Sequence, residues 1–267
     1  MYRLKLYPWD DCVLKLTAIK IPVISLNLGL NGLGRKDSTE LTQAFAAIPM
    51  SVAELDLRSN GLCRKNGAEL AQAFSALSTN ILSLNLRWNN LGKRRGTELA
   101  QAFSAIPLSV TILDLCGNNL YKRNGSELTV AFSAISANVT SIDLSFNKLY
   151  KLSVNQLILM KDSLQHVQTI RLDYNSVNLM STEQRAALKN VFPNVKQIIL
   201  VDNFGKEVAP TIKTTNMVGE LGGKTEVPSL LNQCAFFASR IGINLAGANI
   251  SSDLKEQTQE FLKTTVG

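Results

Sequence analysis

The chain holds few side chains that could carry out acid–base, nucleophilic or metal chemistry. Its one histidine is His166, and no two of its cysteines, Cys12, Cys63, Cys116 and Cys234, stand in a Cys-x-x-Cys spacing. One imidazole without a cysteine at a recognisable spacing provides neither a zinc site nor a nucleophile–base pair. We therefore predict no catalytic centre, no metal site and no cofactor.

The run Gly222-Gly223-Lys224-Thr225 resembles the end of a phosphate-binding loop. That motif requires another glycine five residues before the second of these, and Val218 stands there. We therefore expect no nucleotide site. Four cysteines in 267 residues also do not make a disulfide framework, which indicates a reducing, cytosol-like environment.

The composition is that of a folded chain, with 45% apolar and 18% charged residues. No apolar run reaches the roughly 18 residues that a membrane span needs. Charged residues, among them Arg3, Lys5 and Asp10, interrupt Met1–Leu16, so no signal peptide is visible. The formal net charge is +7, from 28 Lys and Arg against 21 Asp and Glu, which permits an acidic partner.

The elements that would position functional residues follow from an internal repeat. An asparagine recurs every 28 or 29 residues, at Asn31, Asn60, Asn89, Asn118, Asn147, Asn175 and Asn203. An apolar pair such as Leu84-x-Leu86 precedes each one, which predicts a short strand with one face in the core. The asparagine amide can bond backbone groups of its own turn and of the next repeat.

A helix is expected after each strand. In Thr39–Ile48, the residues Leu41, Ala44, Phe45 and Ile48 fall at helical spacing, and the same face recurs in the next three repeats. One strand and one helix cannot bury their own apolar faces, whereas stacked copies can. The sequence predicts an α/β solenoid with parallel strands on the concave face and helices on the convex face.

The pattern divides the chain into three segments: an N-terminal cap over residues 1–21, about seven repeats over 22–205, and a mainly helical C-terminal cap or tail over 206–267. Within the last segment, Lys206 to Val227 is rich in Thr, Gly and Lys and predicts a loop. Two helices are expected after it, over Pro228 to Arg240 and Ser252 to Lys263.

The pattern Leu-x-Leu-x-x-Asn-x-Leu at this period resembles leucine-rich repeat proteins of the ribonuclease-inhibitor type, which implies a horseshoe. The repeat sequence Glu-Leu-x-x-Ala-Phe-x-Ala-Ile also resembles the leucine-rich repeat effectors that intracellular bacterial pathogens inject into host cells. That resemblance implies a non-enzymatic protein, secreted by a bacterium into the host cytosol, that binds a host target. Without secretion, a cytoplasmic protein is expected.

Positive charge gathers in the loops between strand and helix. Four loops carry it: Arg35-Lys36-Asp37, Arg64-Lys65-Asn66, Lys93-Arg94-Arg95 and Lys122-Arg123-Asn124. Their nine cations and one aspartate give +8, whereas the whole chain carries +7. Repeats stacked about 5 Å apart would join these loops into one basic ridge. The ridge is predicted to bind an acidic or phosphate-bearing partner; the alternative is a solvated edge that maintains solubility.

The third loop departs from the others at its last residue. Asp37, Asn66 and Asn124 are helix N-caps with a glutamate three residues later, but the third loop has Arg95. Arginine cannot accept the helix N–H groups, which should cost about 0.5–2 kcal/mol. Arg95 is therefore a candidate functional position, with neutral drift as the alternative.

The strand residues that point into the bend form a second variable set: Asp56, Arg58, Asn85, Arg87, Asp114, Cys116, Asp143, Ser145, Arg171 and Asp173. Trp88, Phe146 and Tyr174 each precede a repeat asparagine, where the repeat requires no aromatic residue. We expect contact centred on the third repeat; the alternative is local packing under the rim. The candidate binding residues are Arg58, Arg64, Lys65, Arg87, Trp88, Lys93, Arg94, Arg95, Lys122, Arg123, Phe146 and Tyr174.

The expected partner is a host protein or a ribonucleoprotein with an acidic surface, such as the ribosome, blocked sterically by a monomer. RNA is an alternative contact, and a membrane is not expected. Two other interpretations stay open. The segment after residue 205 could carry adaptor or ubiquitin-ligase activity, although it shows no Cys-x-Asp motif and no F-box. The ridge could also bind an anionic membrane surface.

Overall fold

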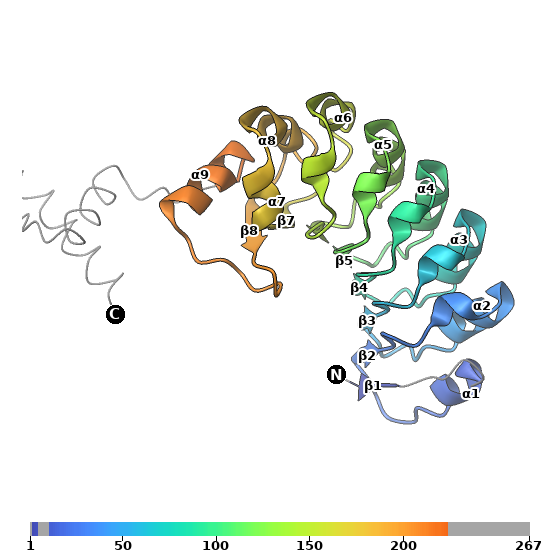
Figure 1. Ribbon diagram of the computed structural model, residues 1–267. Helices are drawn as coiled ribbons and strands as arrows, with labels where there is room; N and C mark the ends of the chain where they lie inside the picture. The colour runs from blue at the N-terminus through green and yellow to red at the C-terminus, as the bar shows by residue number, and fades with distance from the viewer. Residues whose placement is uncertain (1, 5–10, 224–267) are drawn as a thin grey trace, which may run out of the picture. The chain divides into compact units, whose positions relative to one another are not determined.

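The structure is a computed structural model that describes residues 2–4 and 11–223 (Figure 1). Its parallel sheet lies on the inner side of an arc, and the strands follow one another in chain order. The strands are β1 Tyr2–Arg3, β2 Ser25–Asn27, β3 Glu54–Asp56, β4 Ser83–Asn85, β5 Ile112–Asp114, β6 Ser141–Asp143, β7 Thr169–Asp173 and β8 Gln197–Val201. The predicted α/β leucine-rich repeat solenoid is confirmed.

The helices lie on the outer side of the arc (Figure 1). They are α1 Cys12–Thr17, α2 Ser38–Ala46, α3 Gly67–Ser75, α4 Gly96–Ser104, α5 Gly125–Ser133, α6 Val154–Leu159, α7 Tyr174–Leu179, α8 Thr182–Lys189 and α9 Ile212–Glu220. Within residues 11–223, five 3₁₀ turns join strands to helices: η1 Leu33–Arg35, η2 Leu62–Arg64, η3 Leu91–Lys93, η4 Leu120–Lys122 and η5 Leu149–Lys151. The described residues contain no helix that is both long and apolar enough to cross a membrane.

The core lies between the sheet and the helices as one continuous cluster. Each repeat contributes its strand leucine and the predicted inward helix face, so that Leu84, Leu99 and Phe103 are at most 1% exposed. The rings of Phe45 and Phe74, in adjacent repeats, stack with centroids 6.4 Å apart. Since burying one such side chain contributes about 1.5–3 kcal/mol, the stacking of repeats supplies the stability that one repeat lacks.

A ladder of asparagine side chains holds the turns together, as the repeat predicts. Asn89 is fully buried, and its Nδ2 donates to the carbonyls of Leu86 in its own repeat and Leu57 in the preceding one. Its Oδ1 accepts the N–H of Asn60 at 2.9 Å. Asn118 and its neighbours repeat this pattern.

The ladder ends before the last two repeat asparagines, so their predicted role is wrong. Asn175 and Asn203 are exposed and bond each other, with Nδ2 of the first donating to Oδ1 of the second at 2.8 Å. At this end of the ladder, the Asp173 carboxylate accepts the N–H of Phe146 at 2.7 Å, where a backbone carbonyl accepts the equivalent N–H in the earlier repeats. It also caps α7 at Ser176. Because α7 begins directly after β7, the asparagine that follows it points outward.

The C-terminal part of the described chain differs from the predicted loop. Residues 212–220 form α9, with Thr211 as its N-cap and Met217 buried. A helix forms because Met217 and Leu221 pack against the last repeats, which the local Thr and Gly content does not reveal. The two helices expected over 228–240 and 252–263 lie outside the described residues.

Candidate partner-binding surface

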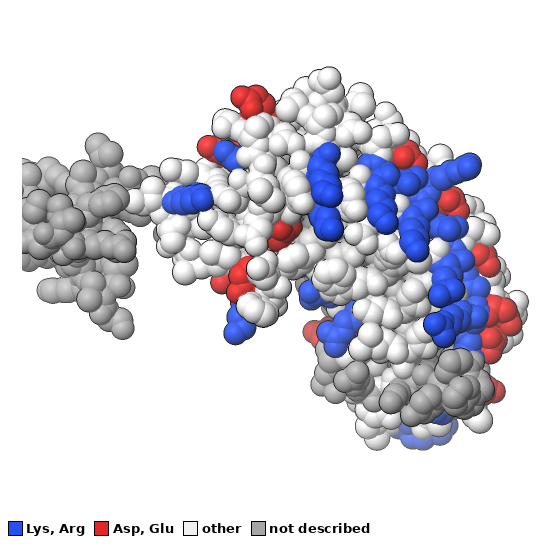
Figure 2. Space-filling view, in the orientation of Figure 1, with Lys and Arg blue, Asp and Glu red and all other residues white. Residues whose placement is uncertain are grey.

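The basic ridge exists as one row of exposed cations along the 3₁₀ turns (Figure 2). Each turn ends in a cation, and these form the exposed row: Arg35, Arg64, Lys93, Lys122 and Lys151. Adjacent turns are joined by backbone bonds, such as that from Gly92 N to Asn118 O at 2.9 Å. The row therefore continues the register of the sheet and advances about 5 Å per repeat.

The second cation of each loop folds back onto the next helix. Lys65 Nζ lies 3.6 Å from the Glu69 carboxylate, and its side chain is only 10% exposed. Arg94 and Arg123 pair in the same way with Glu98 and Glu127. The apolar stems of these side chains fill a covered position, so this column of cations takes part in packing.

Leu152 shows what that position needs. It follows Lys151 as Lys65 follows Arg64, and it is 2% exposed. An apolar side chain thus replaces the lysine stem where the fifth repeat lacks a second cation. Of the predicted ridge residues, the exposed ones are Arg35, Arg64, Lys93, Arg95 and Lys122, and the paired ones are Lys36, Lys65, Arg94 and Arg123.

Arg95 begins α4 without a side-chain cap, as its sequence predicts. Its backbone N–H still donates to the Glu98 carboxylate at 3.0 Å, and this bond is the main cause of the lowered pKa of Glu98. The guanidinium is exposed, so Arg95 adds charge beside Lys93. The bond from the Arg95 N–H to the Glu98 side chain is retained from the capping box. The bond from a side chain at position 95 to the Glu98 N–H is absent, because position 95 carries a surface cation.

The sequence analysis missed Lys148 and Lys151 because their loop holds no basic triplet. Both are exposed, and their Nζ atoms lie 5.5 and 4.9 Å from the centre of the Tyr121 ring. Such placement over an aromatic ring favours a cation. The signal was available in the 29-residue spacing of Arg35, Arg64, Lys93, Lys122 and Lys151.

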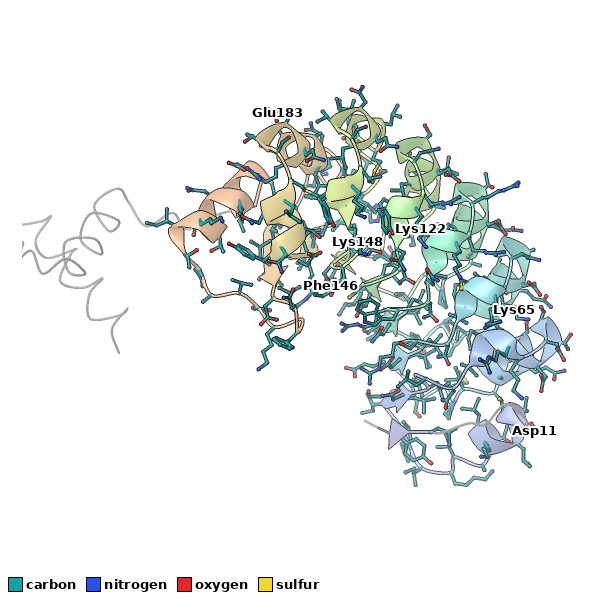
Figure 3. All side chains as sticks on the ribbon, viewed as in Figure 1. Asp11, Lys65, Lys122, Phe146, Lys148 and Glu183 are labelled. Carbon is teal, nitrogen blue, oxygen red and sulfur yellow. The ribbon has the colours of Figure 1, made fainter. Side chains whose placement is uncertain are left out.

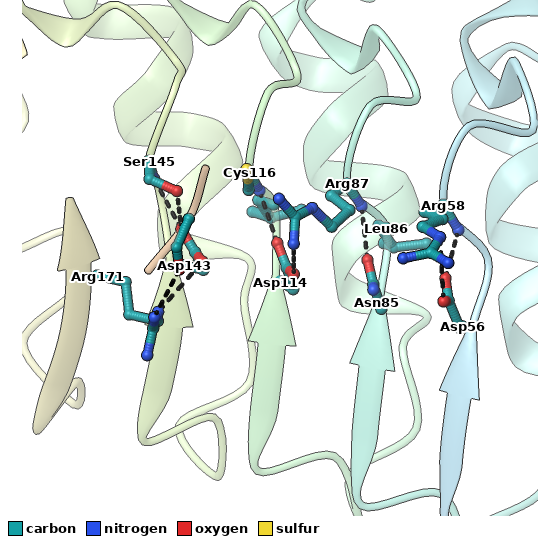
Figure 4. Close-up of polar contacts among 12 residues, drawn as sticks. Asp56, Arg58, Asn85, Leu86, Arg87, Asp114, Cys116, Asp143, Ser145 and Arg171 are labelled. Carbon is teal, nitrogen blue, oxygen red and sulfur yellow. Dashed lines mark hydrogen bonds and ion pairs between the residues drawn. The ribbon is translucent and has the colours of Figure 1, made fainter. Parts of the chain in front are cut away.

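The concave strand ends carry alternating charges (Figure 4). Asp56, Asp114 and Asp143 each accept the backbone N–H two residues later, so they first serve as turn formers. Arg58 Nε lies 3.4 Å from the carboxylate of Asp56. Arginines also reach Asp114 and Asp143 from neighbouring repeats, from Arg87 at 3.9 Å and Arg171 at 3.5 Å. This surface is of mixed charge and partly neutralised.

Four side chains expected to point into the bend are buried. Cys116 and Ser145 are at most 1% exposed, Asp56 is 6% exposed and Asp173 is 7% exposed. Burial raises the pKa of the Cys116 thiol to about 12, which keeps it protonated and removes it as a nucleophile. Ligand atoms of Asp114, Cys116 and Asp143 lie within 4.8 Å of one another, but hydrogen bonds and ion pairs within the protein already engage both carboxylates.

A small polar cavity of about 310 Å³ lies above these strands, between Arg87 and Arg171. The loop after β8 covers one side of it, because Arg171 Nη2 donates to the Gly205 carbonyl at 3.4 Å. Phe204, at the tip of this loop, is 87% exposed. The sequence analysis missed Phe204, since it lies where the repeat pattern ends.

The aromatic residues divide into two places. Trp88 is 50% exposed and stacks on Phe146, two repeats away, with ring centroids 6.1 Å apart. Phe146 lies on the inner side of the turns, with Lys148 and Lys122 toward the helices (Figure 3). Tyr174 does not join this pair: it opens α7, packs on the core and lies 5.8 Å from Lys213 Nζ.

The stacked repeats and the asparagine ladder define a leucine-rich repeat protein, and comparison with solved structures agrees. The chain is similar to the crystal structure of the leucine-rich repeat-containing protein LegL7 from Legionella pneumophila. The two are 35% identical over 86% of this chain and 99% of that chain, with a TM-score of 0.56. The chain therefore belongs to the leucine-rich repeat proteins, a family whose fold is typically a binding scaffold.

A second similar structure is that of the Rad7 and Elc1 complex in yeast, at 14% identity over 83% of this chain and 60% of that chain. Its TM-score is 0.41. No protein-family model and no curated protein matches the chain.

Proposed function

We propose that this protein binds an acidic protein partner through the exposed row of cations and the adjoining concave edge, without catalysis of its own. The observation that carries the proposal is the row itself. Five successive turns each present one exposed cation at the same position, although like charges about 5 Å apart repel one another.

The surroundings of the row favour a narrow acidic ligand. Beyond it, toward the helices, stand the carboxylates of Glu40, Glu69, Glu98 and Glu127. Figure 2 shows acidic side chains along the same margin. On the concave side stand the partly exposed carboxylates of Asp114 and Asp143. A broad polyanion would meet both sets of carboxylates, whereas an acidic segment of a protein can follow the row between them.

The similarity to a Legionella pneumophila protein supports a bacterial origin and an effector role in a host cell. We propose that the partner is a host protein and that binding blocks it sterically. A ribonucleoprotein such as the ribosome remains a second candidate partner, because exposed lysines and arginines also bind phosphates.

Charge reversal tests the proposal. In host-cell lysate, the wild-type chain should retain a specific partner that K93E/K122E loses. K20E/K161E changes two exposed lysines away from the row and makes the same change in net charge. The proposal requires that this control keep the partner. Retention of the partner by K93E/K122E would contradict it, and loss after nuclease treatment would identify a ribonucleoprotein instead.

Salt dependence provides a second test with a purified probe. The affinity of the full chain for poly-L-glutamate should fall steeply as sodium chloride rises, because exposed charge pairs are screened. K93E/K122E should weaken this binding at least tenfold, and K20E/K161E should weaken it much less. Equal weakening by both variants would show that net charge, and not the row, controls binding.

A further inference from the structure

Trp88 and Phe146 form an aromatic seat around a buried glycine. Gly117 lies in the repeat between them, at the same position of the turn, and a Cβ there would overlap the Trp88 indole. The indole thus crosses the neighbouring repeat against its backbone and ends on the Phe146 ring. Only glycine at position 117 allows this arrangement.

The turn position of Trp88 and Phe146 is left-handed throughout the repeats. Its φ is +58° at Trp88 and +56° at Phe146, and Leu30, Ser59 and Gly117 share it, so the repeat sets this conformation. What is particular to Trp88 is its aromatic ring, which leaves half of its surface exposed and is therefore not there only to fill the core. An exposed aromatic ring is a common anchor for a partner.

Cations surround the outer side of the seat. Lys148 is two residues from Phe146, is exposed, and lies between Phe146 and the helices in Figure 3. Lys93 and Lys122, of the exposed row, belong to the repeats of Trp88 and Gly117. An apolar surface and a line of positive charge therefore run side by side across the same three repeats.

We propose that the seat holds an aromatic side chain from an acidic, extended segment of the partner protein, whose carboxylates lie on the exposed row. This inference rests on the proposed function and names the kind of segment that is bound. Aromatic stacking supplies the specific contact, and the cations supply orientation and a fast encounter.

A polypeptide fits this surface better than a single-stranded nucleic acid. Stacked bases would place a phosphate beside every base, and the carboxylates of Asp114 and Asp143 lie three residues before Gly117 and Phe146 in the same repeats. A peptide can place carboxylates only where the cations are. Arg87, the residue before Trp88, already pairs with Asp114 at 3.9 Å, which leaves less charge there for phosphate.

Two synthetic polymers separate the seat from the row. The full chain is titrated with poly-L-glutamate and with a random copolymer of glutamate and tyrosine of equal length. We expect the copolymer to bind about tenfold more tightly. W88A and F146A should remove that preference, while K93E/K122E should weaken both polymers and leave their ratio unchanged.

Gly117→Ala tests the positioning role, because it should displace the indole without removing it. Gly32→Ala is the matched control: its φ is also positive, at +65°, but a Cβ there lies 3.9 Å from the nearest atom, of Arg35. Circular dichroism checks that each variant is folded. W88A keeps the test decisive if G117A does not fold.

The fluorescence of Trp88 provides a direct readout in a Trp9→Phe background, since these are the two tryptophans of the chain. The copolymer should shift its emission, and poly-L-glutamate should not. Equal affinity for the two polymers, or a preference that survives W88A, would refute the proposal that the seat binds an aromatic side chain. The proposed function of the exposed row would still stand. If polyuridylate binds more tightly than the copolymer in a Trp88-dependent way, the seat binds nucleic acid. If neither polymer binds, the proposed function fails as well.

Discussion

The N–H of Asn60 donates to the side-chain oxygen of Asn89 at 2.9 Å, so the amide of one repeat completes the turn of the repeat before it. The same bond joins Asn89 to Asn118. Each asparagine is thus both the donor inside its own turn and the acceptor for its neighbour. Register along the turns is fixed by these bonds, and the positions of the surface cations follow from it.

Replacing a ladder asparagine should be much more damaging than replacing one beyond the ladder. Asn89→Ala leaves buried carbonyls and N–H groups without partners, and each costs about 1–3 kcal/mol. We expect a loss of about 3 kcal/mol or more in the free energy of unfolding. Asn175→Ala, which removes one exposed bond, should cost less than about 0.5 kcal/mol. Urea denaturation measures both, and similar losses would refute the role assigned to the ladder.

Restoring the missing N-cap should stabilise the protein. Arg95→Asn should add about 0.5–1 kcal/mol, because the new side chain can accept the N–H of Glu98 as Asn66 accepts that of Glu69. Asn66→Arg should have the opposite effect. If Arg95 serves binding, the more stable variant should also bind poly-L-glutamate more weakly. A gain in stability without loss of binding would favour neutral drift.

The stem of Lys65 should matter more for stability than its charge. Lys65→Met keeps an unbranched chain in the covered position and should change the free energy of unfolding by less than about 1 kcal/mol. Lys65→Ala removes the stem and should cost about 1–2 kcal/mol. Thermal denaturation distinguishes the two, and equal losses would indicate that the ion pair with Glu69 dominates.

The charge of Asp114 should destabilise the protein at neutral pH. Burial, together with the nearby Asp143, raises the pKa of Asp114 from 3.8 to about 6. A raised carboxyl pKa means that the folded state binds the proton more tightly than the unfolded state. Protonation of Asp114 therefore stabilises the fold fully below about pH 4, and this stabilisation is lost as the pH rises through about 6.

Asp114→Asn keeps the acceptor for Cys116 N and removes the charge. Since a shift of about two pKa units corresponds to about 3 kcal/mol, the variant should be more stable by about 1–3 kcal/mol at pH 8. Near pH 3.5, the free energy of unfolding of the variant should equal that of the wild type. A gain that does not change with pH would exclude ionisation as its cause.

The repeating part of the fold was predictable because one residue pattern fixes both packing and hydrogen bonding. Leu84, Phe103 and Asn89 are buried as their spacing requires. The pattern fails where tertiary contacts replace it. Asn175 lies outside the ladder because α7 begins directly after β7, and α9 forms from residues whose local composition indicates a loop.

The surface was predictable in part. Sequence spacing placed the cations on one edge, but it could not show that Lys65 folds back onto Glu69 while Arg64 stays exposed. The contact between Trp88 and Phe146 crosses two repeats and depends on Gly117, so no local pattern reveals it. Whether these residues bind a partner stays a prediction.

Neighbouring repeats are interchangeable at their ends. Excising residues 67–95 would join Asn66 to Gly96, which keeps an N-cap before the helix and leaves the flanking turns able to bond each other. Gene recombination could therefore lengthen or shorten the molecule by one whole repeat, and each event would add or subtract one cation of the exposed row and about 5 Å of surface. Specificity could then evolve in discrete increments of length, without any new fold.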